Sequence, residues 1–420
     1  MLATPPVASC NAPLFLYLPA APPAASCNAP LFLYLSASPP AASSNTPLFL
    51  YLLATPPAKF CYNGTRIEWR KEAYRLRQIT IYDIAKEANV SVATVSRVLN
   101  GTAPVRKSTR AKVEALIQSY NFQPNGMARS LLKNETGIIG LIVPDLTNPF
   151  YPEVFAGAEH AAHQLGYTFL LSNSIGDYAK ESDYLHLMRE KRVDGILFMG
   201  GRVNLKQCEP HLAQELEQVA SVIPTVLVNG AIRNSNLVSV LTDEGAGTAL
   251  AVQHLIELGH RDIAFLGGES HMSTAAIKLR AYRKVLKDAG LKLLPEWQLM
   301  DSFSIDSGKR QMKHLLSLTE RPTAVVCVND YNAIGAIKAA VEAGLSVPED
   351  ISVVGFDDIP LAHHFIPELT TVSQQANDLG RTAVGVLKQM MEGQKVKKQH
   401  MLEPHLIVRQ STRTLVQHDV

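Results

Sequence analysis

The chain has 420 residues and a formal net charge of +2 at pH 7, so it is long enough for two or three domains and shows no strong overall charge imbalance. Its five cysteines include no CxxC pair, which argues against a disulfide framework or a zinc site and fits a reducing compartment. GxSxG, HExxH, a Walker loop and a GxGxxG motif after a strand are also missing, so we expect no catalytic residues, no metal and no cofactor.

The first 60 residues form an internal repeat with a period of 17, in which SCNAPLFLYL occurs twice and SSNTPLFLYL once. Each apolar strip is too short to span a membrane and too interrupted by proline for one helix. The first charged residue is Lys59, so the basic start of a signal peptide is missing. We expect residues 1–78 to be a repetitive tail, disordered or mis-started, with the natural start shortly before Ile79. The alternative is a tail with a function of its own.

The stretch Ile79–Asn100 predicts two short helices joined by a tight turn. Thr80 precedes the first apolar positions and is expected to cap the first helix, and Ser91 is expected to cap a second helix from Val92 to Leu99. The apolar side chains that would pack between the helices are Ile81, Ile84, Ala85, Val95, Val98 and Leu99. This spacing is typical of a helix-turn-helix, whose second helix enters the major groove of DNA.

The outer face of the second helix would read the DNA sequence. Arg97 is its one long donor and can bond bidentately to guanine, whereas Val92 and Ala93 offer only apolar contacts. Tyr82, Thr94 and Asn100 at the edges would suit phosphates. The residues expected to contact DNA in the head are Thr80, Tyr82, Ser91, Val92, Ala93, Thr94, Ser96, Arg97 and Asn100. The alternative is an ordinary pair of capped surface helices.

The following segment completes a small helical head over residues 79–124. Ser108 is placed to cap a third helix from Thr109 to Tyr120. Between Ile79 and Lys133, eight basic residues stand against three acidic ones, which gives a net charge of +5 over 55 residues. A local positive field suits a polyanionic partner, although a solvated basic face is the simpler alternative.

ITIYDIAKEANVSVATVSRVLNG resembles the head of the lactose/galactose-repressor family of bacterial transcription regulators, and the resemblance extends to about Thr412. It implies a cytoplasmic, nucleoid-associated homodimer on double-stranded operator DNA. It also implies that residues 125–137 are a hinge helix that inserts Leu131 into the minor groove, with Asn125 and Ala128 beside it. A leucine wedge kinks the duplex, and so short a helix is marginal in water, which would make the hinge a switch. The alternative is an amphipathic linker helix.

Residues 138–415 show apolar runs that alternate with helical segments. The runs are GIIGLIVP, YTFLLSN, DGILFMG, PTVLVNG, IAFLGG, TAVVCVND and ISVVGFDD. Such runs indicate parallel sheets that are covered on both faces. Because this length is large for one core, we predict an α/β core of two doubly wound lobes, which resembles the periplasmic-binding-protein architecture of the family.

Ligands of open α/β sheets bind beyond the carboxyl ends of the strands, where this chain has carboxylates, amides and aromatic rings. Asp145, Phe303, Asn329 and Asp357 also match positions at which the family holds its effector, a sugar or sugar phosphate. For each single residue, a turn or a helix cap is the alternative. The expected effector-binding residues are Asp145, Asn148, Phe150, Lys278, Phe303, Asn329 and Asp357.

Lys278 departs from the family, which often has an arginine four residues before the aromatic residue that is here Tyr282. Lysine cannot form the bidentate hydrogen bonds of an arginine. The nearest arginine, Arg280, lies two residues further along the chain. The type of effector therefore stays open.

The nearest overall resemblance is to the catabolite-control branch, whose members bind a serine-phosphorylated phosphocarrier protein. Members of that branch bind the phosphate of the phosphocarrier protein with basic residues on the helix after the TTV segment. The matched positions here are Gly385 and Gln389, with Arg381 and Lys388 out of place nearby. A serine phosphate needs an Arg or Lys partner, so a small-molecule effector is the preferred reading.

The sequence therefore predicts a sequence-specific DNA-binding transcriptional regulator, a repressor of carbohydrate-metabolism genes under the control of a small effector in the core. No membrane partner is expected. One alternative is a catabolite-control regulator whose DNA binding is enhanced by the phosphocarrier protein. Another is a solute-binding protein for transport, against which the helix-turn-helix and the missing signal peptide argue.

Overall fold

The computed structural model describes residues 61–62, 65–66, 79–100, 103–120, 122 and 135–415. The predicted hinge residues Asn125, Ala128 and Leu131 and the repeats of the N-terminal tail lie outside the described residues. Before the head, the described part of the chain contains two short strands, β1 (Cys61–Tyr62) and β2 (Thr65–Arg66), which pair antiparallel.

The head domain has three helices, α1 (Ile81–Ala88), α2 (Val92–Asn100) and α3 (Lys107–Ser119). Thr80 caps α1 as predicted, in a capping box with Asp83 in which the Thr80 backbone N–H donates to Asp83 Oδ2 at 2.9 Å. The expected cap of α3 is wrong: this helix begins at Lys107 behind Arg106, and Ser108 lies inside its first turn. The buried side chains of the head are Ile84, Ala85, Ala88, Val95, Val98 and Val113.

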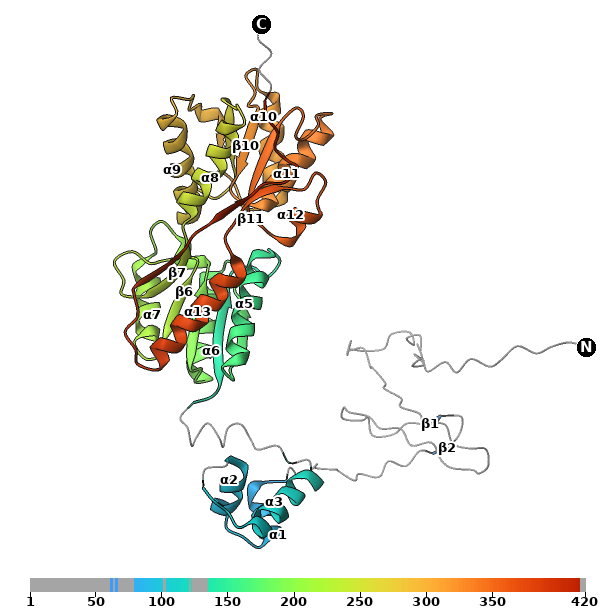
Figure 1. The fold of residues 1–420 in the computed structure, drawn as a ribbon, viewed down its shortest axis with the longest axis vertical. Helices are drawn as coiled ribbons and strands as arrows, with labels where there is room; N and C mark the ends of the chain where they lie inside the picture. Colours follow the sequence, from blue (N-terminus) through green and yellow to red (C-terminus); the bar gives the residue numbers. More distant parts are fainter. Residues whose placement is uncertain are drawn as a thin grey trace, which may run out of the picture. The chain divides into compact units, whose positions relative to one another are not determined.

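The first lobe of the core is a six-stranded, fully parallel sheet with the strand order β13-β7-β6-β5-β3-β4. Its strands are β3 (Ile138–Val143), β4 (Thr168–Asn173), β5 (Gly195–Met199), β6 (Thr225–Val228), β7 (Val238–Thr242) and β13 (Gln399–Leu402). Its helices are α5 (Phe150–Gln164), α6 (Tyr178–Glu190), the 3-10 helix η1 (Gly201–Asn204), α7 (Pro210–Ala220) and α13 (Ala376–Met391). Helices α5 and α13 lie side by side on one face (Figure 1), and α6 and α7 cover the other.

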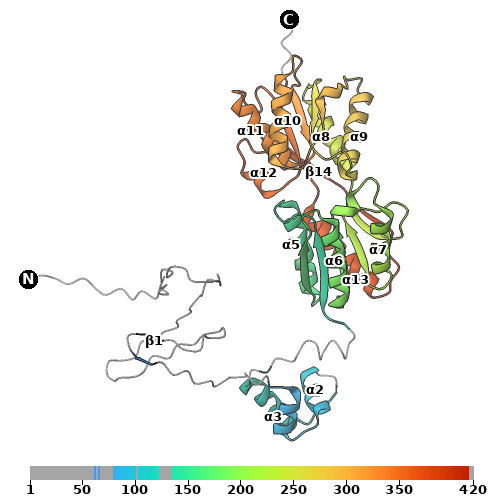
Figure 2. The ribbon, with the colours of Figure 1, turned by 180° about the vertical axis from the view of Figure 1, so that it is seen from behind.

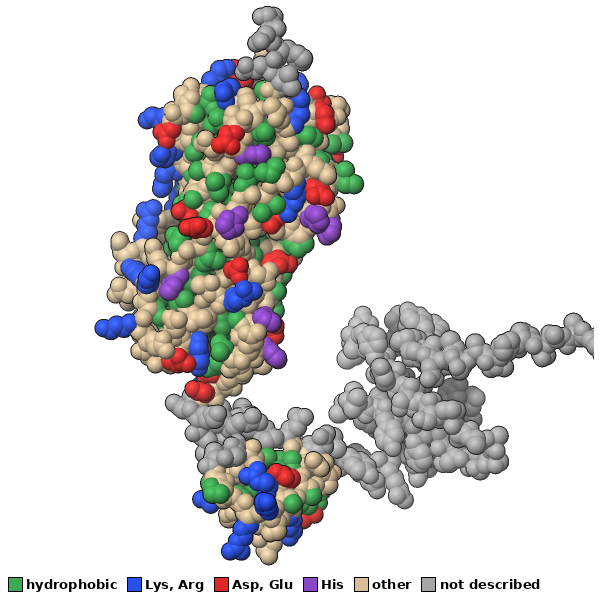
Figure 3. All heavy atoms as spheres, viewed as in Figure 1, with side chains coloured by type: hydrophobic (Ala, Val, Ile, Leu, Met, Phe, Trp, Pro, Cys, Tyr) green, Lys and Arg blue, Asp and Glu red, His purple; other side chains and the backbone are tan. Residues whose placement is uncertain are grey.

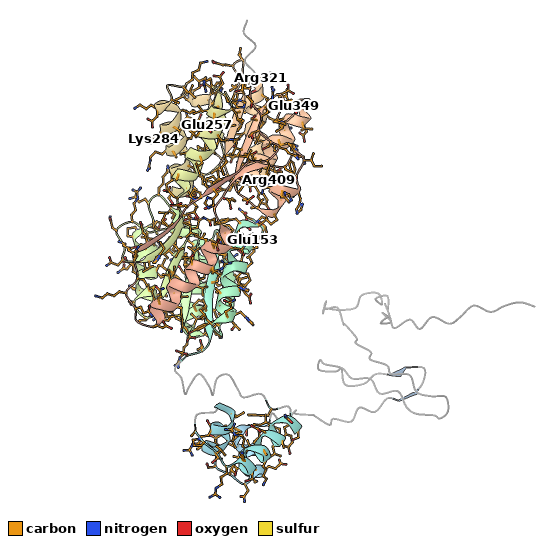
Figure 4. The ribbon with its side chains drawn as sticks, viewed as in Figure 1. Glu153, Glu257, Lys284, Arg321, Glu349 and Arg409 are labelled. Atoms are coloured by element: carbon orange, nitrogen blue, oxygen red, sulfur yellow. The ribbon has the colours of Figure 1, made fainter. Side chains whose placement is uncertain are left out.

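Helices α5 and α13 approach each other closely because glycines line their contact. A Cβ atom on Gly157 would lie 2.0 Å from the backbone oxygen of Asn377, so only glycine fits there. Next to it, Asn377 Nδ2 donates to Glu153 Oε2 at 2.8 Å; Glu153 is labelled on α5 in Figure 4. The last long helix of the chain is thus an integral part of the first lobe.

The second lobe has the strand order β14-β12-β11-β10-β8-β9, in which only β14 runs antiparallel. Its strands are β8 (Ile263–Leu266), β9 (Gln298–Leu299), β10 (Ala324–Cys327), β11 (Ser352–Asp357), β12 (Thr370–Ser373) and β14 (His405–Ile407). Its helices are α8 (Glu244–Glu257), α9 (Ser273–Asp288), η2 (Pro295–Trp297), α10 (Ile305–Ser317), α11 (Asp330–Glu342) and α12 (Pro360–His364). Helices α8 and α9 cover one face of the sheet and α10 and α11 the other (Figure 2). The predicted core of two doubly wound lobes is confirmed.

The chain passes between the lobes three times, after β7, after β12 and after β13. These three crossovers are hydrogen-bonded to one another. Thr242 Oγ1 donates to Gln374 O at 2.9 Å, and the Asp243 backbone N–H donates to Leu402 O at 3.1 Å. The connection between the lobes is therefore one bonded bundle of three segments.

The lobes also touch away from the crossovers, for example through two side-chain hydrogen bonds. Tyr331 Oη of α11 donates to Thr147 O at 2.8 Å, and Ser273 Oγ of α9 donates to Asn204 O at 2.9 Å. Thr147 and Asn204 both lie in segments that follow the carboxyl ends of first-lobe strands, β3 and β5. Of the helices in the described ranges, none has both the length and the apolar character that crossing a membrane requires.

Candidate DNA-reading helix and effector site

Helix α2 presents two chemically different faces. Val95 and Val98 are buried against the rest of the head, whereas Ala93 and Arg97, one helical turn apart, are exposed. The Arg97 side chain is exposed on the outer face of the helix. The helix therefore has the arrangement that the sequence predicted for reading a base edge, with Val92, Thr94 and Ser96 partly exposed beside the arginine.

The residues at the helix starts have structural roles as well. Ser91 Oγ accepts from the Thr94 backbone N–H at 3.2 Å and lies 2.9 Å from Thr94 Oγ1, so Ser91 caps α2 as predicted. Tyr82 is 71% exposed and lies on α1. Figure 3 shows basic side chains on the surface of the head, as a polyanion partner requires. Contacts of these residues with phosphates stay a prediction, as do those of Asn100.

The loop after β3 holds three of the predicted effector residues. Asp145 Oδ1 accepts from Thr147 N at 2.8 Å and from Thr147 Oγ1 at 2.7 Å, and Asn148 Oδ1 accepts from Phe150 N at 3.1 Å. Phe150 is only 3% exposed and packs in the apolar core of the first lobe. Its ring was expected to face the effector, but its place at the start of α5 turns it inward. Asp145 and Asn148 shape the loop and stay partly exposed.

Asn329 and Phe303 are brought together by a hydrogen bond. Asn329 Nδ2 donates to Phe303 O at 3.0 Å, and Asn329 Oδ1 accepts from Asn332 N at 2.9 Å as the cap of α11. Both atoms of the Asn329 amide thus already have partners in this structure. The Phe303 ring is partly buried and packs on the apolar cluster beneath α8 and α9.

Lys278 is the centre of a buried cluster in the second lobe. Its Nζ lies 3.4 Å from Glu244 Oε1, donates to Val328 O at 2.9 Å, and stands 3.5 Å from the centre of the Phe356 ring. Burial raises the pKa of Glu244, although the ammonium of Lys278 opposes this shift. Arg280 is exposed on α9, so it does not take the place of the family's arginine.

Asp357 ends β11 beside this cluster. Its Oδ1 accepts from Gln374 Nε2 of the second crossover at 2.7 Å. Burial raises the pKa of Asp357 to about 6; Lys278 and the Gln374 hydrogen bond oppose the rise, and Glu244 adds to it. A carboxyl group with this pKa is poised between its two protonation states near neutral pH, which marks it as a candidate functional group.

Tyr151, at the start of α5, is a titratable residue that the sequence did not single out. Burial raises the pKa of its hydroxyl well above the usual range, and the charges of Asp357, Asp145 and Glu244 add to the shift. Tyr151 directly follows Phe150, so α5 carries it on a different face. Glu244 was also missed, because it follows β7, a strand that no continuous apolar run announces. Both residues belong to the candidate effector site.

Helix α13 carries the positions that a phosphocarrier site would use. Gly385 and Gln389 are exposed. The neighbouring basic residues already have acidic partners: Arg381 Nη1 lies 2.6 Å from Asp378 Oδ1, and Lys388 Nζ lies 3.3 Å from Glu392 Oε1. This surface therefore offers a phosphate no cation at the matched positions.

A helix-turn-helix head with an exposed arginine, followed by two α/β lobes of which the second holds a buried charged cluster, defines a DNA-binding transcriptional regulator. The lacI family of bacterial regulatory proteins matches residues 80–125, and the periplasmic binding protein-like domain matches residues 252–412. The chain belongs to the lacI family and is not an enzyme.

Two relatives and one solved structure show how far this likeness extends. The chain is 38% identical over 335 residues to the HTH-type transcriptional regulator RegA of Clostridium saccharobutylicum, covering 79% of this chain and 99% of that protein. It is 38% identical over 337 residues to catabolite control protein A of Priestia megaterium, covering 80% and 99%. The crystal structure of the lac repressor dimer bound to operator and the anti-inducer ONPF matches with a TM-score of 0.73 at 31% identity, covering 80% of this chain and all of that one.

Proposed function

We propose that this regulator is a homodimeric repressor of carbohydrate-metabolism genes. A small effector bound between its lobes controls its affinity for operator DNA. The observation that carries the proposal is the buried Glu244–Lys278 pair together with Asp357, whose carboxylate accepts from Gln374 in the second crossover between the lobes. The lac repressor structure, with operator and a small anti-inducer on one dimer, supports the same arrangement for this chain. We place the protein in the cytoplasm, on the nucleoid.

An effector would act by shifting the relative position of the lobes around the three crossovers. Gln374 lies in one crossover and also bonds Asp357, so a ligand at Asp357 reaches the connection between the lobes directly. The required energy is small, since 1.4 kcal/mol changes an affinity about tenfold. In the predicted hinge, residues 125–137, such a shift would change how readily the Leu131 helix forms on DNA.

A gel-shift experiment tests the proposal. The full chain is titrated onto DNA from upstream of its own gene, with a scrambled duplex of equal length as the control. We expect tighter binding to the upstream DNA, and a change in that affinity when the effector is added. Equal binding to both duplexes would reject the role of a sequence-specific repressor.

The similarity to catabolite control protein A favours a second candidate, in which a serine-phosphorylated phosphocarrier protein enhances DNA binding. The absence of basic residues at Gly385 and Gln389 makes this the weaker proposal. Adding the phosphorylated and the unphosphorylated carrier to the same gel shift separates the two. A rise in operator affinity with the phosphorylated form alone would favour the second candidate.

A further inference from the structure

A groove lies at the end of the first lobe where its parallel strands begin, opposite the end that carries Asp145. It has a volume of about 580 Å³, which is within the size range of ligand pockets. Its floor is apolar and is formed by Val222, Ile223 and Pro224, in the turn before β6, and by Met391, the last residue of α13. We call it the hinge-root groove, after the predicted hinge that enters the lobe beside it.

The apolar floor of the groove is open to solvent. Val222 is 65% exposed, whereas the following Ile223 is 9% exposed and anchors the turn in the core of the lobe. Single exposed apolar side chains are ordinary on protein surfaces, but apolar side chains gathered in one patch mark an interaction site. The hinge-root groove therefore offers apolar contact to a further group.

The charged rim of the groove is balanced. Among the described residues that line it, Arg189 and Arg192 stand against Glu135 and Asp194, so their formal charges sum to zero. A phosphate or the DNA backbone gains little long-range attraction from a rim without net charge. The occupant that suits this groove is therefore mainly apolar.

The chain itself enters the lobe at this rim. The two carboxylate oxygens of Asp194 accept from the backbone N–H groups of Thr136 and Gly137, so the chain just before β3 is fixed beside the groove. Residues 125–134, which lie outside the described part of the chain, end directly before Glu135 of the rim. The start of the groove and the end of the predicted hinge therefore coincide.

The predicted hinge carries an apolar side chain within reach of the groove. Leu132 follows the predicted wedge Leu131 and precedes Glu135 by three residues. Because an extended chain spans at most about 3.3–3.6 Å per residue, Leu132 lies within roughly 11 Å of the rim. Its side chain is thus the nearest leucine before the groove, on a segment whose other end is held in place.

We propose that, in the absence of DNA, the predicted hinge docks on its own first lobe with the side chain of Leu132 in the hinge-root groove, and that this contact competes with operator DNA. The proposal rests on the proposed function, in which the same segment forms the hinge on DNA. Both partners of the contact belong to one chain, which keeps their effective concentration high. Docking lowers the apparent operator affinity in proportion to the fraction of chains whose hinge is free.

Hydrogen–deuterium exchange of the full chain without DNA tests the docking directly. Val222→Asp places a charge on the floor of the groove, where burying it is unfavourable. We expect peptides that cover residues 125–134 to exchange at least threefold faster in this variant than in the wild-type protein. The matched control is Val408→Asp, at a valine of the second lobe that is 58% exposed, and it should leave these peptides unchanged. Equal exchange in the wild-type protein and Val222→Asp would overturn the proposal.

A double-mutant cycle tests the competition with DNA. Gel shifts measure the operator affinity of the wild-type protein, Val222→Asp, Leu132→Ala and the double variant. We expect Val222→Asp to raise the affinity at least threefold, and Leu132→Ala to be at least threefold less favourable in the Val222→Asp background than in the wild-type protein, because the shared contact is already lost. A direct contact of Leu132 with DNA is lost in both backgrounds alike and cancels in the cycle. Independent effects of the two changes would overturn the proposal.

Should Val222→Asp fail to fold, as circular dichroism would show, Val222→Ser replaces it in both measurements with the same expected directions. A small apolar molecule is the alternative occupant of the groove. In that case Val222→Asp leaves the exchange of residues 125–134 in the purified chain unchanged, which overturns the docking. The gel shift on upstream DNA is read separately: if the chain fails to prefer that DNA, the proposed function falls, whereas the docking is judged by the exchange of the DNA-free chain.

Discussion

The carboxylate of Asp194 holds the backbone of Gly137: Asp194 Oδ2 accepts from the Gly137 N–H at 2.6 Å, and Oδ1 accepts from the Thr136 N–H at 2.8 Å. Thr136 Oγ1 also donates to Arg192 O at 3.1 Å. The last two residues of the predicted hinge, Thr136 and Gly137, are therefore hydrogen-bonded to the turn between α6 and β5.

Removing this attachment should weaken both stability and control. A hydrogen bond to a charged group contributes roughly 1.5–3 kcal/mol, so we expect Asp194→Ala to lower the free energy of unfolding by about 2–4 kcal/mol. The ratio of operator affinities with and without effector should also shrink. Urea denaturation and the gel shift measure the two effects. Asp183→Ala, an exposed aspartate on α6, is the control and should change neither.

Arg97 should carry most of the hydrogen-bonded sequence recognition, since its exposed neighbour Ala93 offers only a methyl group. We expect Arg97→Ala to weaken operator binding by roughly 1–3 kcal/mol and to relax the preference at one base pair. Binding to a set of single-site operator variants measures this. Arg280→Ala, an exposed arginine on the core, serves as the control. An equal loss on operator and on random DNA would mean that Arg97 contacts only the phosphate backbone.

Asp357 should make the stability depend on pH in a definite direction. Burial raises the pKa of Asp357 from 3.8 to about 6, so the folded chain keeps this proton over a range in which the unfolded chain has released it. The contribution is full below about pH 4 and is lost as the pH rises to about 6, a fall of about 3 kcal/mol. Asp357→Asn cannot ionise, and its amide oxygen can still accept from Gln374. Denaturation at several pH values should show a smaller fall for this variant, and parallel curves would contradict the assignment.

Leu131 lies outside the described residues, so its role rests on the resemblance alone. If it is the wedge, Leu131→Ala should reduce the bending of operator DNA, because an inserted leucine is what unstacks and kinks the base step. Energy transfer between dyes at the two ends of the duplex reports the bend. Leu132→Ala is the control at the next position. Unchanged bending in Leu131→Ala would place the wedge elsewhere.

The parts that could be predicted from the sequence are those with local causes. Thr80 and Ser91 cap their helices through atoms three residues away, and the continuous apolar runs of β3, β5 and β6 announce strands that are buried on both faces. β14 has only three residues at a sheet edge, none of them fully buried, so its short apolar run did not predict a strand.

The candidate effector site was harder to predict because its contacts join distant segments. Lys278 was singled out from its position, but its partner Glu244 comes from a neighbouring helix 34 positions earlier in the sequence. Phe150 was chosen because it follows the apolar run of β3 closely, but it is the first residue of α5 and its ring is buried in the first lobe. The ring of Tyr151 is only partly buried and packs against the same core, in edge contact with Phe150.

The three passages of the chain between the lobes have a consequence for its synthesis on the ribosome. The first lobe buries Leu379, Ala383, Val384 and Leu387 of α13 and completes its sheet with β13, so its final pieces are translated only after nearly all of the second lobe. The first lobe therefore keeps the apolar face that α13 covers exposed until about the last tenth of the message is translated. A nonsense codon just after Gln375 would remove α13 and β13 from the first lobe and β14 from the second. We expect such a product to be a substrate for chaperones and proteases rather than a shortened repressor.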